Sequence, residues 1–135
     1  MARDHAGIVV VDDDIHVLGG RVDSFHTNSS LHHHYDPQAD RWEFRTPMPT
    51  PRSGHGCVLY RDKVFVMGGE GTNRVFGQNE AWDPLADRWE SHAPMPTPRH
   101  GMGAVVVDDQ VVVAGGGPQM GGGVKSAINE VFRLD

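Results

Sequence analysis

The feature that most constrains this chain is a repeat with a period of 47 residues. The segment YDPQADRW at Tyr35–Trp42 recurs as WDPLADRW at Trp82–Trp89, 47 positions further on. At the same spacing, PMPTPR at Pro47–Arg52 recurs unchanged at Pro94–Arg99. A fixed period of roughly 20–50 residues is typical of architectures in which similar units stack side by side. We therefore interpret the chain as three successive units.

Each unit begins with two short apolar runs joined by a polar turn, and the second run ends in a pair of glycines. In the second unit these runs are Gly56–Tyr60 and Val64–Gly69, and in the third they are Gly103–Val107 and Val111–Gly116. Runs of about five residues rich in β-branched side chains favour strands joined as hairpins over helices. Because the runs are apolar almost throughout, we expect both faces of these strands to be covered.

The rest of each unit predicts two further strands. A loop of variable length leads to a third strand that ends in an aromatic residue, an Asp-Pro turn follows, and a fourth strand carries a tryptophan. Four antiparallel strands in about 47 residues correspond to one propeller blade. The recurring framework residues are Gly19, Gly20, Tyr35, Asp36, Trp42, Arg52, Gly68, Gly69, Trp82, Asp83, Trp89, Arg99, Gly115 and Gly116.

The glycine pair, the Tyr/Trp-Asp-Pro turn, the following tryptophan and the Met-Pro…Pro-Arg link together resemble the kelch repeat, over essentially the whole chain. The resemblance implies an all-β fold of kelch-type β-propeller blades, each a four-stranded antiparallel sheet. We place blade 1 at about 3–49, blade 2 at about 50–96 and blade 3 at about 97–135, the last without its fourth strand. The repeat's aromatics are expected to wedge between neighbouring sheets, so removing Trp42 or Trp89 should cost roughly 3–5 kcal/mol.

About 2.75 blades are too few for a closed ring, because propellers close with about 4–8 blades. We therefore expect either a part of a longer propeller or self-association, with a homodimer supplying six near-blades. In isolation, the outer faces of the first and last blades would expose apolar surface, and the third strand of blade 3 would be a free edge.

The composition of the chain limits which classes of partner it could bind and where in the cell it could be located. The net charge is -6 with no block of Lys or Arg, which argues against nucleic-acid and anionic-membrane binding. The single cysteine, Cys57, has no partner for an intrachain disulfide. The start, MARDHAGIVVVDDD, lacks the pattern of a signal peptide, and no apolar run approaches the ~18 residues of a transmembrane helix. We expect a cytoplasmic location.

Specificity is expected in the loops between second and third strands, which vary while the framework stays constant. In an antiparallel blade these loops share one side with the blade-to-blade links, and variable loops on a rigid scaffold commonly carry binding. Phe25, Phe76 and Arg74 are predicted to be exposed interface anchors; the alternative is that all are ordinary loop residues. The candidates are Arg21, Asp23, Phe25, His26, Asn28, Asn73, Arg74, Phe76, Gln119, Met120 and Lys125.

Arg52 and Arg99 precede equivalent first strands, and their repetition favours a scaffold role over ligand binding. We expect each to pair with a carboxylate of a neighbouring blade. The recurring candidates are Glu80 and Glu130, just before the third-strand aromatic.

The resemblance favours non-catalytic protein or peptide binding without a cofactor. The alternative is a fragment of a kelch-type enzyme or carbohydrate-binding propeller, similar to galactose oxidases or sugar mutarotases; a purely structural fragment is a third possibility. An oxidase would require a Tyr-Cys pair, for which Cys57 and Tyr60 are the candidates. A mutarotase would place arginine and histidine around a central channel, here Arg52, His55, Arg99 and His100.

Three consecutive histidines, His32–His34, stand where the second unit has Asn79, Glu80 and Ala81. Alternation along a strand puts His32 and His34 on one face. That pair could chelate a metal, with His26 as a third ligand, although nothing guarantees a nearby carboxylate or thiolate. Substitution into an ordinary strand is the favoured interpretation.

Overall fold

The computed structural model describes all 135 residues as strands and loops without helices. Neighbouring strands in every sheet are antiparallel, so the expected all-β fold with four-stranded blades is confirmed. Blade 1 contains β1 (Gly7–Val11), β2 (Asp14–Leu18), β3 (His32–Asp36) and β4 (Arg41–Arg45). Blade 2 contains β5 (Gly56–Tyr60), β6 (Lys63–Met67), β9 (Asn79–Asp83) and β10 (Arg88–His92). Blade 3 contains β11 (Gly103–Val107), β12 (Gln110–Ala114) and β13 (Asn129–Phe132).

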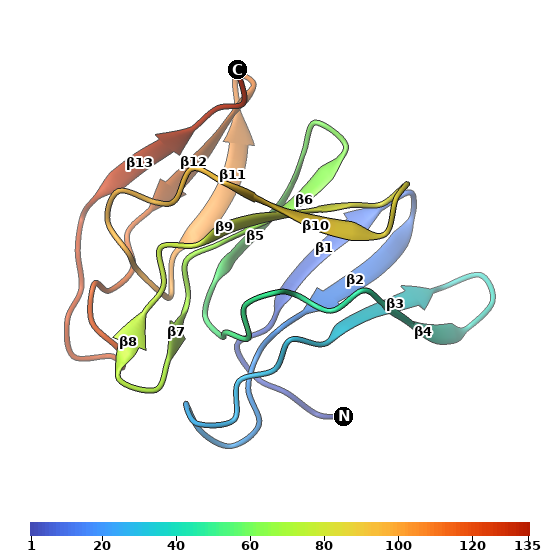
Figure 1. Cartoon of the computed structure of the whole chain (residues 1–135), viewed down its shortest axis with the longest axis horizontal. Helices are drawn as coiled ribbons and strands as arrows, with labels where there is room; N and C mark the ends of the chain where they lie inside the picture. Colours follow the sequence, from blue (N-terminus) through green and yellow to red (C-terminus); the bar gives the residue numbers. More distant parts are fainter.

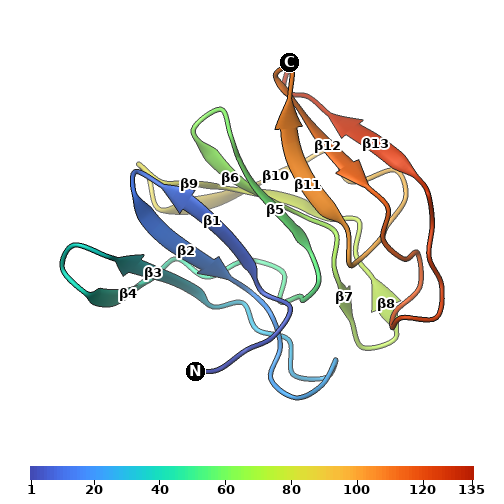
Figure 2. The same cartoon turned by 180° about the vertical axis from the view of Figure 1, so that it is seen from behind.

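The three sheets fan out from their first strands. β5 lies between β1 and β11, and the ring that these strands begin is not closed (Figures 1 and 2). The loops between second and third strands gather on one side, at the lower edge of Figure 1. There blade 2 adds a small hairpin, β7 (Glu70–Gly71) and β8 (Arg74–Val75), which the sequence pattern did not predict.

Two apolar clusters hold the blades together. The alternating pattern of each strand sends one set of side chains toward each neighbouring sheet, as strand geometry requires. Between blades 1 and 2 the buried residues are Val11, Leu18, Met48, Val64, Val66 and Trp82. Between blades 2 and 3 they are Tyr60, Phe65, Met67, Ala81, Met95, Met102, Val111 and Val113.

The glycine pairs connect consecutive blades through the backbone. The Gly20 amide donates to the Arg52 carbonyl at 3.0 Å, and the Gly69 amide donates to the Arg99 carbonyl at 2.8 Å. Gly68 has φ of 66°, and a Cβ at this position would lie 2.5 Å from the Arg99 carbonyl oxygen. Both the left-handed backbone and the close approach therefore require glycine.

The two repeated arginines are fully buried scaffold residues. Arg52 donates to the Val66 carbonyl at 2.9 Å and lies 3.1 Å from a Glu80 carboxylate oxygen. Arg99 makes the matching ion pair with Glu130 at 2.9 Å. Each carboxylate comes from the arginine's own blade, so the expected pairing across blades is wrong. Burial lowers the pKa of Arg52 to about 10, but the guanidinium remains charged at neutral pH.

Burial of the repeat's aromatics depends on which blade carries them. Trp82 is 2% exposed between blades 1 and 2, whereas Trp42 is 58% exposed on the outer face of blade 1. The expectation that Trp42 wedges between sheets is wrong, because no sheet covers that side. Phe44 on the same face and Val131 on the outer face of blade 3 are also exposed, which confirms that both end blades present apolar surface.

We expect Gly68→Ala to lower the free energy of unfolding by at least 2–3 kcal/mol, because the new methyl group meets backbone. Gly101 is a matched control, since its φ is 64° but nothing lies within 4 Å of the place that a Cβ would take. Gly101→Ala should therefore cost only about 1 kcal/mol. Urea denaturation of both variants measures the difference, and equal losses would contradict the close-approach argument.

We expect Trp82→Ala to cost about 3–5 kcal/mol and Trp42→Ala under about 1 kcal/mol, because only Trp82 leaves a cavity between two sheets. Trp82 is buried between two blades, and Trp42 lies on a face without a neighbour, so each variant is the other's control. Thermal or urea unfolding would show a similar loss for both if blade 1 were covered in solution.

Candidate binding surface

Three loops form the surface on which the predicted binding residues lie, and we call it the loop surface. It consists of residues 21–31 of blade 1, residues 70–78 with the β7–β8 hairpin of blade 2, and residues 117–127 of blade 3 (Figure 1). The blade 1 loop contacts the hairpin: His26 Nδ1 shares a 3.0 Å hydrogen bond with the Thr72 hydroxyl, which donates to the Phe25 carbonyl at 3.3 Å. The loops are therefore joined to one another.

Glu70 organises the loop surface and was not among the predicted residues. Its carboxylate is buried and reaches all three loops: one oxygen lies 2.9 Å from Arg21 Nη1, and the other accepts from the Gly121 amide at 2.8 Å. His100 Nδ1 lies 3.4 Å from that second oxygen. One feature of the sequence could have indicated Glu70: the residue directly after each glycine pair changes in charge from blade to blade, as Arg21, Glu70 and Gly117.

The candidates from blade 1 are largely engaged within the protein. Arg21 bonds Asp4 at 2.9 Å in addition to Glu70, and its guanidinium lies 4.3 Å from the centroid of the Phe25 ring. Phe25 is thus half-buried rather than the exposed anchor expected. Asn28 donates to the Glu70 backbone carbonyl at 2.7 Å. Asp23 and His26 stay exposed at the rim.

The hairpin of blade 2 carries two of the predicted anchors, and they differ in exposure. Phe76 is 6% exposed, so its expected role as an exposed anchor is wrong. Its ring packs against the Gly71 backbone and lies under the Arg74 guanidinium, at 4.5 Å from the centroid to Cζ. Arg74 itself is exposed and has no carboxylate within ion-pair distance. The stacking holds a free cation in a defined place.

A groove runs between the hairpin and the blade 3 loop. Asn73, Arg74 and Val75 line one side, and Pro118, Gln119 and Met120 line the other. The Gln119 backbone carbonyl accepts a hydrogen bond from His100 Nε2 at 2.8 Å. The wall formed by the blade 3 loop is thus held by His100, whose Nδ1 lies near Glu70. The structure thus brings Asn73, Arg74 and Gln119 together. Lys125 is exposed further along the loop, outside this groove.

The residues considered for catalysis are not arranged for it. Cys57 and Tyr60 point to opposite sides of β5, since Cys57 packs toward blade 1 and the Tyr60 hydroxyl donates to the Asp109 carbonyl of blade 3 at 2.9 Å. Burial raises the pKa of the Cys57 thiol to about 12, so it stays protonated at neutral pH. Arg52, His55 and Arg99 are buried rather than directed into a channel.

The consecutive histidines have structural partners. His32 and His34 share the buried face toward blade 2, and there His32 Nε2 shares a 2.8 Å hydrogen bond with His16 Nδ1. His34 Nε2 lies 2.7 Å from Asp14. His26 belongs to the exposed loop instead, and no group of three or more His, Cys, Asp or Glu residues has metal-binding geometry.

His33 lies on the opposite face of β3 from the buried histidines. Its Nδ1 is 2.9 Å from Arg3 Nη1, so it takes the place that Glu80 has beside Arg52 in blade 2. Burial, followed by the proximity of Arg3, lowers the pKa of His33. The imidazole is therefore a neutral partner for Arg3 at physiological pH.

Three buried histidines predict a stability that decreases as the pH falls. Burial lowers the pKa of His16 to about 4 and those of His32 and His55 to about 3. Below a pH of about 6.5 these histidines bind protons in the unfolded chain, but they stay neutral in the folded chain. The free energy of unfolding that is present above pH 6.5 is therefore lost as the pH falls from about 6.5 to 4. Each histidine should contribute a loss of about 1.4 kcal/mol per pH unit in that window.

Urea midpoints at pH 7.5, 6.5, 5.5 and 5 check this dependence. His32→Asn, which installs the residue that blade 2 has at this position, should flatten the slope, whereas His5→Gln at an exposed site should leave it unchanged. Stability that is constant from pH 7.5 to 5 would contradict the assignment.

Comparison with protein families gives a match over the entire chain. The model described as the KLHDC2/KLHL20/DRC7 Kelch-repeats domain matches residues 1–135.

No helix has the length and apolarity that a bilayer crossing demands.

Several known proteins are similar to parts of the chain. Beta-scruin of Limulus polyphemus is 43% identical over 68 residues, which are 50% of this chain and 7% of scruin. Kelch-like protein 26 of Danio rerio is 32% identical over 65 residues, 48% of this chain and 10% of that protein. The chain thus spans a tenth or less of these relatives. The solved structure of YjhT superposes with a TM-score of 0.74 at 19% identity, covering 86% of this chain and 35% of YjhT.

Proposed function

The chain belongs to the kelch-repeat family, and from that premise we propose that it is a non-catalytic module that binds a protein or peptide through the loop surface. The groove beside Arg74 carries the proposal. It combines an exposed cation held in place by stacking with two amide side chains, Asn73 and Gln119, and with apolar contacts from Val75 and Met120. Such a mixture suits a peptide side chain and its backbone better than a small apolar ligand.

The groove also indicates the chemistry of its ligand. Arg74 has no carboxylate of its own, so a carboxylate of the partner would gain a charge-assisted hydrogen bond without displacing an internal pair. Asn73 and Gln119 offer donors and acceptors on opposite walls. An extended peptide with an acidic residue at Arg74 matches this arrangement.

The module is proposed to act within a larger assembly. Its two end faces are apolar, with Val10 and Phe44 exposed on blade 1 and Val105 exposed on blade 3. Stacking of further blades, from a longer chain or from a second copy, would bury both faces. The loop surface lies away from these faces and would stay accessible (Figure 2).

A panned peptide library tests the proposed function. Peptides selected on the purified chain are synthesised with a fluorescent label, and their Kd is measured by anisotropy. Arg74→Glu should weaken binding at least tenfold, because it places a like charge against the peptide carboxylate. Arg88, an exposed arginine of β10 outside the groove, provides the control, and Arg88→Glu should leave Kd unchanged. Equal affinity for all three proteins would exclude the groove as the binding site.

A further inference from the structure

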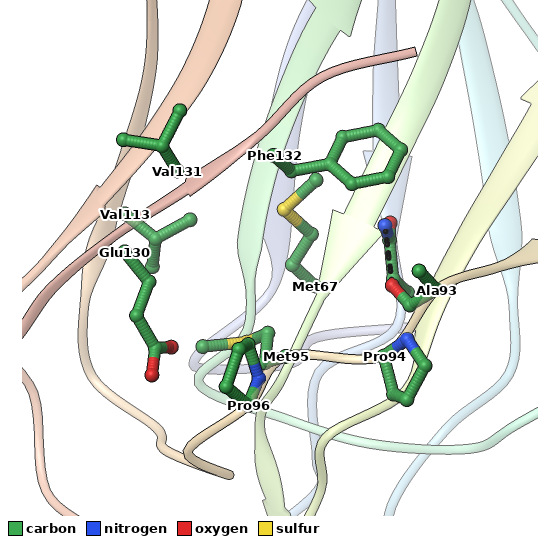
Figure 3. Close-up of a pocket in the computed structure, with 10 residues that line it drawn as sticks. Met67, Ala93, Pro94, Met95, Pro96, Val113, Glu130, Val131 and Phe132 are labelled. Atoms are coloured by element: carbon green, nitrogen blue, oxygen red, sulfur yellow. Dashed lines mark hydrogen bonds between the residues drawn. The ribbon is translucent and has the colours of Figure 1, made fainter. Parts of the chain in front are cut away.

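The groove beside Arg74 differs in origin from the apolar pocket between blades 2 and 3. Figure 3 shows that Met67, Met95 and Phe132 line this pocket. The repeat relates the pocket to the place that Trp89 occupies in blade 2, so it belongs to the framework of the blades. The groove has no such counterpart, because the loops that form its walls differ from blade to blade. The residues that hold those walls are therefore particular to this chain.

Each blade has an antiparallel bridge between the residue three places before its first strand and the residue after its glycine pair. The side chains at this bridge change from blade to blade: the pairs are Asp4 with Arg21, Ser53 with Glu70, and His100 with Gly117. In blade 3 the glycine leaves room for the histidine, since a Cβ at Gly117 would lie 3.1 Å from His100 Nε2. The imidazole therefore lies between the blade 3 loop and Glu70 of blade 2.

The imidazole of His100 faces a hydrogen-bond acceptor at each of its two nitrogens. Nε2 lies 2.8 Å from the Gln119 carbonyl oxygen, and Nδ1 lies 3.4 Å from Oε2 of Glu70. A carbonyl oxygen only accepts, so Nε2 carries a proton. The state of Nδ1 then decides the sign of its contact with Glu70. A bare Nδ1 turns a lone pair toward the carboxylate, whereas a protonated Nδ1 forms an ion pair with it.

The contact between His100 and Glu70 is shielded from water. The His100 side chain is 12% exposed and that of Glu70 is 3% exposed, so salt screens their interaction much less than it screens a surface pair. Arg21 lies 2.9 Å from the other oxygen of Glu70. On its outer side Arg21 also meets Asp4 at 2.9 Å and His5 at 3.2 Å. These groups of blade 1 reach His100 only through Glu70.

The remaining neighbours of His100 bring no charge to the ring. Arg99 precedes it in the chain, but its guanidinium turns into blade 3 and pairs with Glu130. The link before β5 approaches the ring with Gly54, which has no side chain. Lys125 is exposed further along the blade 3 loop. Glu70 is thus the one carboxylate within ion-pair distance of His100.

Protonation of His100 closes a ring of polar contacts around one wall of the groove. The Gly121 amide donates to the same Glu70 oxygen at 2.8 Å. Contacts therefore run from the Gln119 carbonyl through His100 and Glu70 back to Gly121. Met120 lies between the two tied residues and lines the groove. With Nδ1 bare, the ring is open at the contact between His100 and Glu70, and this wall is held less firmly.

We propose that Glu70 and His100 form a proton-dependent clamp that positions the groove wall at Gln119–Gly121 and controls the affinity of the groove for an acidic peptide. The inference rests on the proposed function, because it takes the groove as the binding site. A histidine changes charge within the range of about pH 5 to 8. Closing the clamp reduces the entropy that the wall loses on binding, and the added positive charge attracts a carboxylate. The groove therefore binds more tightly at pH 5.5 than at pH 8.

The clamp is first tested without a peptide, by nuclear magnetic resonance of the whole chain. The Gly121 amide signal should shift between pH 8 and pH 5.5, because its acceptor Glu70 gains a second partner when His100 is protonated. Carboxylates ordinarily titrate near pH 4, below this range. His100→Gln keeps an amide donor near the place of Nε2 but takes up no proton, so the shift should be absent. A Gly121 signal that stays constant, or that shifts equally in the variant, would overturn the proposal.

Binding is the second test. A labelled acidic peptide selected on the purified chain is titrated by anisotropy at both pH values. The Kd of the wild-type chain should be at least threefold lower at pH 5.5, whereas that of His100→Gln should be the same at both. His26→Gln changes an exposed histidine of the loop surface and should keep the wild-type response. Circular dichroism checks that all three proteins stay folded at both pH values.

Failure of the clamp and failure of the proposed function give different results. If Arg74→Glu weakens binding but the wild-type Kd does not depend on pH, the groove is the binding site and the clamp is wrong. The clamp is also wrong if His100→Gln responds to pH as the wild-type chain does. If Arg74→Glu leaves Kd unchanged, the groove is not the binding site, and the clamp has no role in affinity.

Discussion

The structure depends on one short connection between consecutive blades, in which a glycine amide bonds the carbonyl of an arginine one blade further on. Gly69 makes this bond to Arg99, whose side chain is buried and paired with Glu130. The backbone of the arginine joins two blades while its guanidinium ties together the strands of its own blade. A buried cation is tolerable only when it is paired, and Arg99 has the Glu130 carboxylate and the Gly115 and Ile128 carbonyls as partners. The connection and the ion pair therefore support each other.

The connections between blades repeat, so the sequence differences between blades lie mainly in the loops between second and third strands. One of these variable residues, Glu70, connects the loops. Its carboxylate binds Arg21 of the preceding blade and the Gly121 amide of the following blade. The loop surface is consequently a fixed shape rather than three independent loops. Preorganisation of this kind reduces the entropy lost when a partner binds.

The repeat in the sequence was sufficient to predict the eleven blade strands, their order and the unclosed ring, because strand period and turn chemistry are local properties. Predictions that depend on neighbours in space were less successful. Trp42 carries the same motif as Trp89 but has no sheet above it, and Phe76 occupies a loop but packs under Arg74. The place of Glu70 after its glycine pair was a signal in the sequence, but its partners come from loops that no pattern aligns, so its contacts could not be predicted.

The exchange of glutamate for histidine at His33 gives the outer face of blade 1 a different charge balance from the interface between blades 1 and 2. Between blades 1 and 2 the buried Arg52 is neutralised by Glu80, so those sheets stack across a balanced pair. On the outer face of blade 1, Arg3 bonds the neutral imidazole of His33 and the Gly19 and Val17 carbonyls, and none of these partners balances its positive charge. Any sheet that stacks there meets an arginine without a carboxylate partner, whereas Arg52 and Arg99 inside the chain are each paired with a glutamate. The outer face of blade 1 is therefore distinguished by charge as well as by shape.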